Sequence, residues 1–187
     1  MKHLFGKLML AAVLAGVAPT AMGQSMADEV KNSFQHWKYD FSEEGRKAWK
    51  PEITVRMGAS IYHGGPSITG GIRIDEKRTL GLMLGHREYY SDHIPCTDYV
   101  MMTALYYRRY QPLGKKQIFA LYSEVTLGGA FRYASTRPAG TKDNFTLSPL
   151  QLGWEGGVRI RFWRNIHIFL GPTFSTTYSG IHAGFGF

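Results

Sequence analysis

Several Arg and Glu residues of this sequence share one phase of a two-residue alternation in which hydrophobic residues occupy the other phase. Successive side chains of a β-strand point to opposite faces, so these charged side chains fall on one face of a sheet. If the sheet closes into a barrel, they meet inside it, where an unpaired charge costs several kcal/mol. The predicted luminal set is Arg56, Arg73, Arg87, Arg109, Glu124, Arg132, Glu155, Arg159 and Arg161.

Glu124 and Glu155 fall on neighbouring predicted strands within this Arg-rich set. The interior of a small barrel is just wide enough for side chains to fill it. We therefore expect an Arg–Glu network that plugs the lumen. Because Arg outnumbers Glu, water, Tyr hydroxyls or bound anions must satisfy the remaining donors, and this leaves an anion site or a narrow pore as an alternative.

Ser179 and His182 are the residues closest to a nucleophile and base pair, and His86 and Glu88 lie together in another segment. Ser179 and His182 are three positions apart in the predicted strand, so the two side chains point to opposite faces and do not favour a catalytic dyad. We expect His182 to be a packed luminal residue.

The sequence contains no motif that would bind a metal or a cofactor. The histidines are scattered, no Cys/His cluster has zinc-ligand spacing, and the acidic residues match no calcium loop, so we predict no metal and no cofactor. Cys96 is the only cysteine, which rules out an intramolecular disulfide, and we expect an ordinary loop residue.

Eight segments of alternating hydrophobicity must position these residues. In the first, Ile53, Val55 and Met57 alternate with Thr54 and Arg56. A strand of about 9–11 residues crosses a membrane, and lipid offers no partner to an open sheet edge. We therefore predict an all-β fold, an eight-stranded antiparallel up-and-down transmembrane β-barrel over residues 51–187.

The fourth segment, residues 99–110, contains two adjacent arginines that cannot both face inward. We predict Arg109 on the luminal face and Arg108 near the periplasmic end, where a long side chain can reach the interface. The residues predicted to face outward are Val100, Met102, Ala104 and Tyr106.

The two ends of the sequence indicate export to an outer membrane. Residues 1–23 have a positive start, a short apolar run and small residues before Gln24, as a secretory signal peptide does. Outer-membrane barrels typically finish on an alternating strand with a terminal aromatic that the barrel-assembly machinery reads, and we expect Phe187 to serve as that signal.

Residues 24–50 precede the barrel. Val30, Phe34, Trp37 and Phe41 recur at helical spacing, which predicts an amphipathic helix lying on the inner membrane surface. A poorly ordered periplasmic leader is the alternative.

With both termini periplasmic, the links at 75–78, 111–117 and 163–166 become short periplasmic turns, and 91–98 and 134–148 become surface loops that could bind extracellular ligands. Aromatic girdles are then expected at both rims. The inner rim would hold Tyr106, Tyr110, Phe119, Phe162, Trp163, Phe185 and Phe187. The outer rim would hold Tyr62, Tyr89, Tyr90, Tyr99, Phe131, Phe174 and Tyr178.

The formal charge is +8 and falls to +6 without Lys2 and Lys7 of the signal, since 8 − 2 = 6. A basic balance can indicate nucleic-acid binding, but the export signal and the lack of a long Lys/Arg run argue against that partner.

The segment from Ala104 to Glu124 has a Tyr-rich strand, a turn at Pro112-Leu113-Gly114 and a second strand ending in a luminal Glu. In this it resembles the hairpins of small eight-stranded outer-membrane barrels of the OmpX/OmpA-like type. The resemblance implies adhesion, surface protection, membrane anchoring or lipid interaction, with outer-membrane lipids and lipopolysaccharide as neighbours, and we expect a monomer.

We therefore expect a non-enzymatic integral outer-membrane protein with a structural or surface-interaction role. The alternatives are a lipid A-modifying enzyme and a narrow pore.

Overall fold

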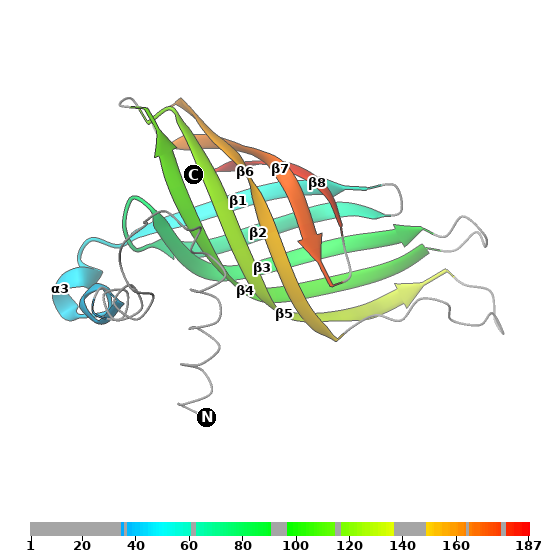
Figure 1. Ribbon diagram of the computed structural model, residues 1–187. Helices are drawn as coiled ribbons and strands as arrows, with labels where there is room; N and C mark the ends of the chain where they lie inside the picture. Colours follow the sequence, from blue (N-terminus) through cyan, green and yellow to red (C-terminus); the bar gives the residue numbers. More distant parts are fainter. Residues whose placement is uncertain are drawn as a thin grey trace, which may run out of the picture.

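The computed structural model describes residues 35, 37–60, 63–90, 97–114, 117–136, 149–163, 165–176 and 179–187. Eight antiparallel strands form one closed barrel in chain order, which confirms the predicted fold class (Figure 1). The strands are β1 (Lys50–Ala59), β2 (His63–Arg73), β3 (Arg78–Tyr90), β4 (Thr97–Leu113), β5 (Phe119–Ser135), β6 (Leu150–Trp163), β7 (Ile166–Ser175) and β8 (Ser179–Gly186). A short helix, α3 (Glu43–Arg46), precedes β1.

The barrel closes where β8 pairs with β1. Phe187 extends this pairing, because its N–H donates to the Ile53 carbonyl at 2.9 Å and its carbonyl accepts from the Ile53 N–H at 3.3 Å. Every strand therefore has two neighbours, and the sheet exposes no free edge. We call the end of the barrel with Lys50 and Phe187 the terminal end, and the opposite end the loop end.

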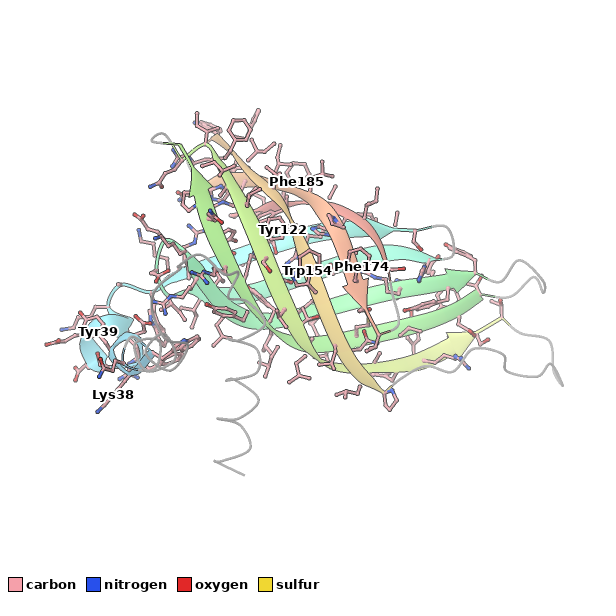
Figure 2. The ribbon with its side chains drawn as sticks, in the orientation of Figure 1. Lys38, Tyr39, Tyr122, Trp154, Phe174 and Phe185 are labelled. Carbon is pink, nitrogen blue, oxygen red and sulfur yellow. The ribbon has the colours of Figure 1, made fainter. Side chains whose placement is uncertain are left out.

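The outer wall of the barrel is apolar. Its exposed side chains include Ile53, Val55, Met57, Ile68, Leu82, Leu84, Leu121, Leu152, Leu170, Ile181 and Phe185. On the same wall, Trp154 of β6 stacks on Phe174 of β7 with ring centroids 6.0 Å apart (Figure 2). Polar and charged side chains, together with apolar ones such as Val100 and Met102, fill the interior. No helix among the described residues is long and apolar enough to cross a membrane.

Strand β4 has the opposite phase to the predicted one, so the predictions that Val100, Met102, Ala104 and Tyr106 face outward and that Arg108 reaches the interface were wrong. Val100 and Tyr106 are 0% and 1% exposed and face the interior with Met102 and Ala104, and Arg108 is 0% exposed. The prediction that Arg109 is luminal was wrong, because Arg109 alternates with these residues and is exposed on the outer wall.

Hydrophobicity could not identify the inner face of β4, because both faces carry apolar residues. Met101 and Leu105 are exposed on the outside, opposite in phase to the buried Val100 and Met102. The neighbouring strand β5 shows which residues of β4 face the lumen, because Arg108 lies directly across from the buried Glu124 in the β4–β5 register.

The predicted aromatic girdles are only partly present. Tyr106, Tyr110 and Tyr89 are buried and belong to the interior, which corrects their assignment to the rims. The aromatics exposed toward the terminal end are Phe119, Phe162, Trp163, Phe185 and Phe187, and those exposed toward the loop end include Tyr90, Phe131 and Phe174. Tyr62 and Tyr178 lie outside the described residues.

Other predictions also fall outside the described residues. These concern the signal peptide 1–23, residues 24–34 with Val30 and Phe34, Cys96, and the greater part of loops 91–98 and 134–148.

Candidate functional site: the luminal ion-pair network

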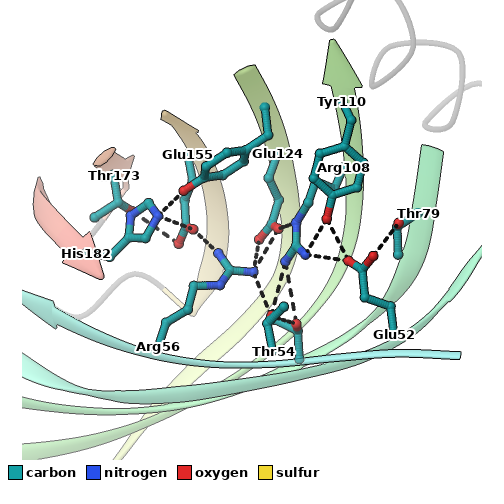
Figure 3. A network of polar contacts seen from close by, with 12 residues as sticks. Glu52, Thr54, Arg56, Thr79, Arg108, Tyr110, Glu124, Glu155, Thr173 and His182 are labelled. Atoms are coloured by element: carbon teal, nitrogen blue, oxygen red, sulfur yellow. Dashed lines mark hydrogen bonds and ion pairs between the residues drawn. The ribbon is translucent and has the colours of Figure 1, made fainter. Parts of the chain in front are cut away.

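The centre of the lumen is occupied by Glu124 of β5 and two arginines that bind it (Figure 3). Arg108 of β4 donates from Nε to Glu124 Oε2 at 2.6 Å, and Arg56 of β1 donates from Nη2 to the same oxygen at 2.8 Å. All three side chains are buried. Glu124 therefore joins β1 to β4 and β5 across the interior.

On one flank of this centre, Glu52 of β1 accepts hydrogen bonds from four residues. It accepts hydrogen bonds from Arg108 Nη1 at 2.6 Å, the Tyr110 hydroxyl at 2.7 Å and Arg73 Nε at 2.9 Å. The Thr79 hydroxyl adds a longer bond at 3.4 Å. This carboxylate is buried with its hydrogen-bonding capacity well used, as a buried charge requires.

On the other flank, Arg56 pairs with Glu155 of β6. Glu155 also accepts from the Thr173 hydroxyl at 3.3 Å and lies 3.7 Å from His182 Nε2. The Tyr122 hydroxyl hydrogen-bonds to His182 in turn.

The network forms a chain of alternating charge. It runs in the order Arg73, Glu52, Arg108, Glu124, Arg56 and Glu155, so its arginines and glutamates are equal in number. Glu124 and Glu155 face each other across the β5–β6 pairing, where two like charges would repel. Arg56 bonds to both and removes that cost.

Among the predicted luminal residues, the structure brings Arg56, Arg73, Glu124 and Glu155 together in this network. The sequence prediction missed Glu52 and Arg108. Glu52 precedes Thr54 by two residues, so extending the β1 alternation one step earlier would have found it. No comparable feature of the sequence could have identified Arg108, because both faces of β4 carry apolar residues.

The remaining predicted arginines lie elsewhere. Arg159 is buried with its guanidinium carbon 4.1 Å from the centroid of the Tyr110 ring, a cation–π contact. Arg87 donates to the Gly65 carbonyl at 2.5 Å, and Arg132 Nε lies 3.5 Å from Asp98 Oδ1.

Arg161, at the terminal end of β6, is exposed. Arg109, which lies on the outer wall, and Arg161 are both outside the network of ion pairs described above.

Glycines on neighbouring strands make room for the large luminal side chains. A Cβ on Gly184 of β8 would lie 2.6 Å from Arg56 Cγ, well inside van der Waals contact. A Cβ on Gly71 would collide with the Tyr106 hydroxyl. The sequence thus places small residues beside large ones on nearby strands.

A small cavity of about 20 Å³ lies beside Glu155, lined also by Met83, Arg87, Met102 and Thr173. It can hold about one water molecule. Small-molecule sites are typically ~300–1,000 Å³, so the cavity is far too small for a ligand of that kind. Within the described ranges, no group of three or more His, Cys, Asp or Glu side chains is placed to bind a metal.

The candidate catalytic residues are kept apart. Ser179 is exposed, whereas His182 is 3% exposed and faces the lumen. His86 lies toward the loop end, where its Nε2 is 2.8 Å from the Tyr133 hydroxyl. A different pair, Ser60 and His63, does form a hydrogen bond in the β1–β2 hairpin.

A closed barrel with an apolar outer wall and an ion-paired polar interior belongs to the class of membrane-spanning β-barrels. No protein-family model matches the sequence, and no curated protein matches it. Among solved structures, the chain is similar to the Yersinia pestis outer membrane protein Ail in a phospholipid bilayer nanodisc. The match has 10% sequence identity and a TM-score of 0.41, and it covers 74% of this chain and 99% of that chain.

Proposed function

We propose that this chain is an integral outer-membrane barrel with a sealed lumen and a non-enzymatic role, either structural or in surface interaction. The observation that carries the proposal is the continuous ion-pair network across the interior. Its members are paired with one another, and the positive charges of its arginines equal the negative charges of its glutamates in number. Such a network fills the middle of the lumen with paired side chains, and this supports a sealed resting state.

The energetics of buried ion pairs support a sealed resting state. Removing one partner of a buried pair costs about 3–5 kcal/mol, because the remaining charge is left without compensation. Arg108 and Glu124 are both fully buried, so opening a path between them requires breaking such a pair.

Planar-bilayer conductance tests the sealed lumen. The unaltered protein should give no steady openings, and Glu124→Ala should produce them, because Arg56 and Arg108 lose their common partner. Glu88→Ala, which removes a carboxylate at the loop end that accepts from the Tyr90 hydroxyl, is the matched control and should stay silent. Steady openings of the unaltered protein that Glu124→Ala or Arg159→Ala abolishes would show a pore instead.

We assign the surface role to loops 91–98 and 134–148, which include most of the links from β3 to β4 and from β5 to β6. With the termini on the periplasmic side, the loop end faces the exterior. The proposed neighbours are outer-membrane lipids and lipopolysaccharide. Recognition of Phe187 by the barrel-assembly machinery and a monomeric state stay predictions.

Lipid A modification is the second candidate, and one observation favours it. The Ser60 hydroxyl and His63 Nδ1 are hydrogen-bonded near the loop end, as a nucleophile and base require. The two residues are three positions apart in a hairpin that also joins the Ser60 N–H to the His63 carbonyl, so the bond equally serves the turn.

Comparing lipid A acyl patterns with and without the gene separates the two candidates. We expect identical patterns. A changed pattern that Ser60→Ala abolishes, while Ser179→Ala leaves it intact, would overturn the non-enzymatic role and identify the Ser60–His63 pair as the site.

A further inference from the structure

Residues 37–49 form a folded segment at the terminal end of the barrel, which we call the collar. The Phe41 N–H donates to the Trp37 carbonyl at 3.2 Å, so a helical turn precedes α3. Ser42 then caps α3, since its hydroxyl accepts from the Gly45 N–H at 3.2 Å. Figure 1 shows α3 beside the terminal end, next to the beginning of β1.

The collar is joined to the outer wall by an ion pair and an aromatic contact. Asp40 Oδ2 lies 2.8 Å from Nη1 of Arg78, the first residue of β3. The Trp37 ring lies 5.8 Å from that of Tyr107, an outward residue of β4, and 5.9 Å from the Arg78 guanidinium carbon. Two adjacent strands therefore hold the same helical turn.

Arg78 is held in place for this contact by the β2–β3 turn. Its Nε donates to Asp75 Oδ2 at 2.7 Å. Partial burial raises the pKa of the Asp75 carboxyl, but hydrogen bonds from Arg78 and the Lys77 N–H outweigh it and lower the pKa below its ordinary value. The carboxylate is thus charged at neutral pH and orients the guanidinium that binds Asp40.

Aromatic rings continue from the wall into the collar. Trp37 stacks on Phe41 with centroids 5.5 Å apart, and Phe41 meets the edge of Trp49 at 5.3 Å. Tyr39 and Phe41 nevertheless remain 60% and 44% exposed. Figure 2 shows Lys38 and Tyr39 on the collar beyond the barrel end.

This aromatic surface is continuous with the apolar outer wall, because Tyr107 follows the exposed Leu105 on the same face of β4. Aromatic rings interspersed with Lys and Arg are typical of the membrane–water interface. Lys38, Arg46 and Lys47 are exposed on the collar and can reach headgroup phosphates.

We propose that the collar is a phospholipid-binding surface that lies in the headgroup region at the terminal end and inserts Tyr39 and Phe41 into the acyl-chain boundary. This inference rests on the proposed membrane-barrel function. It deepens that function by naming phospholipid as the partner of one defined segment.

Site-directed spin labelling tests the proposal in the full chain, reconstituted in phosphatidylcholine/phosphatidylglycerol vesicles. Labels are placed through Tyr39→Cys and, separately, Leu82→Cys, each in a Cys96→Ser background. Collision with oxygen reports lipid, and collision with a soluble nickel chelate reports water. We expect the label at 39 to favour oxygen over nickel, at a shallower depth than the label at 82.

The two labels separate failure of the collar from failure of the barrel. A nickel-accessible label at 39 with an oxygen-accessible label at 82 overturns the collar proposal and leaves the membrane barrel standing. Nickel access at both positions contradicts the membrane barrel itself.

A second comparison tests how the collar is held. Arg78→Ala combined with Tyr107→Ala should increase the mobility of the label at 39 and its nickel access. Tyr107→Phe preserves the ring and should leave both unchanged. Unchanged spectra in the double-alanine variant would show that these contacts do not position the collar.

Discussion

The lumen contains two regions that are filled in different ways, although β4 passes through both. One is the ion-pair network around Arg108, and the other is a cluster of buried apolar side chains formed by Tyr89, Val100, Met102 and Ala130. The apolar cluster packs together side chains from β3, β4 and β5, which are neighbours in the sheet. The ion pairs instead connect β1 with β4, β5 and β6 across the lumen.

This difference separates two tasks in one narrow interior. Apolar side chains fill volume between adjacent strands, and any combination of suitable size can do so. A buried carboxylate requires particular donors at particular positions, because leaving it unpaired is costly. We infer that the network specifies which strands meet across the lumen, whereas the apolar cluster supplies packing.

The largest expected effect is at the centre of the network. Glu124→Ala leaves Arg56 and Arg108 without their shared partner, and it should lower the free energy of unfolding by about 3–5 kcal/mol. Urea unfolding in phospholipid vesicles, followed by Trp fluorescence, measures the change. Glu88→Ala at the loop end should stay within about 0.5 kcal/mol, and equal losses in the two variants would contradict the special role of Glu124.

A smaller effect is expected in the apolar region. Met102→Ala removes a buried side chain beside the existing cavity and should destabilise the barrel by about 2 kcal/mol. Met102→Leu conserves volume and should cost less than about 1.5 kcal/mol. If the leucine variant loses as much as the alanine variant, the region depends on specific shape and the contrast with the network weakens.

The smallest effect concerns the space that one glycine provides for the network. Gly184→Ala brings a methyl group against Arg56 and the Val55 carbonyl, and it should cost about 1 kcal/mol through overpacking. Gly70→Ala is the matched control, because nothing lies within 4 Å of its Cβ position. Equal unfolding free energies for the two variants would show that Arg56 and the Val55 carbonyl shift without cost.

The strands and the closure of the barrel could be predicted because alternation over eight short segments leaves an antiparallel barrel as the architecture with no open edge. The alternation also predicted correctly which residues face the lumen in a strand with only one apolar face, as for Thr54 and Arg56 in β1.

In β4 the alternation did not identify the inward face. Val100 and Met102 inside are as apolar as Met101 and Leu105 outside. The choice between Arg108 and Arg109 depends on Glu124, which lies 16 residues from Arg108 in the sequence. Partners across the lumen, such as Glu52 for Arg108, follow from how the strands are arranged in space, and local periodicity carries no information about that arrangement.

The most direct test of the network is a double-mutant cycle between Arg108 and Glu124, measured by unfolding in vesicles. Arg108→Met, Glu124→Leu and the double variant should show a coupling of about 2–3 kcal/mol, as residues in one buried network do. The cycle with Arg109→Met replacing Arg108→Met should give a coupling near zero. A coupling near zero for Arg108, or a larger one for Arg109, would contradict the assignment of Arg108 to the centre of the lumen.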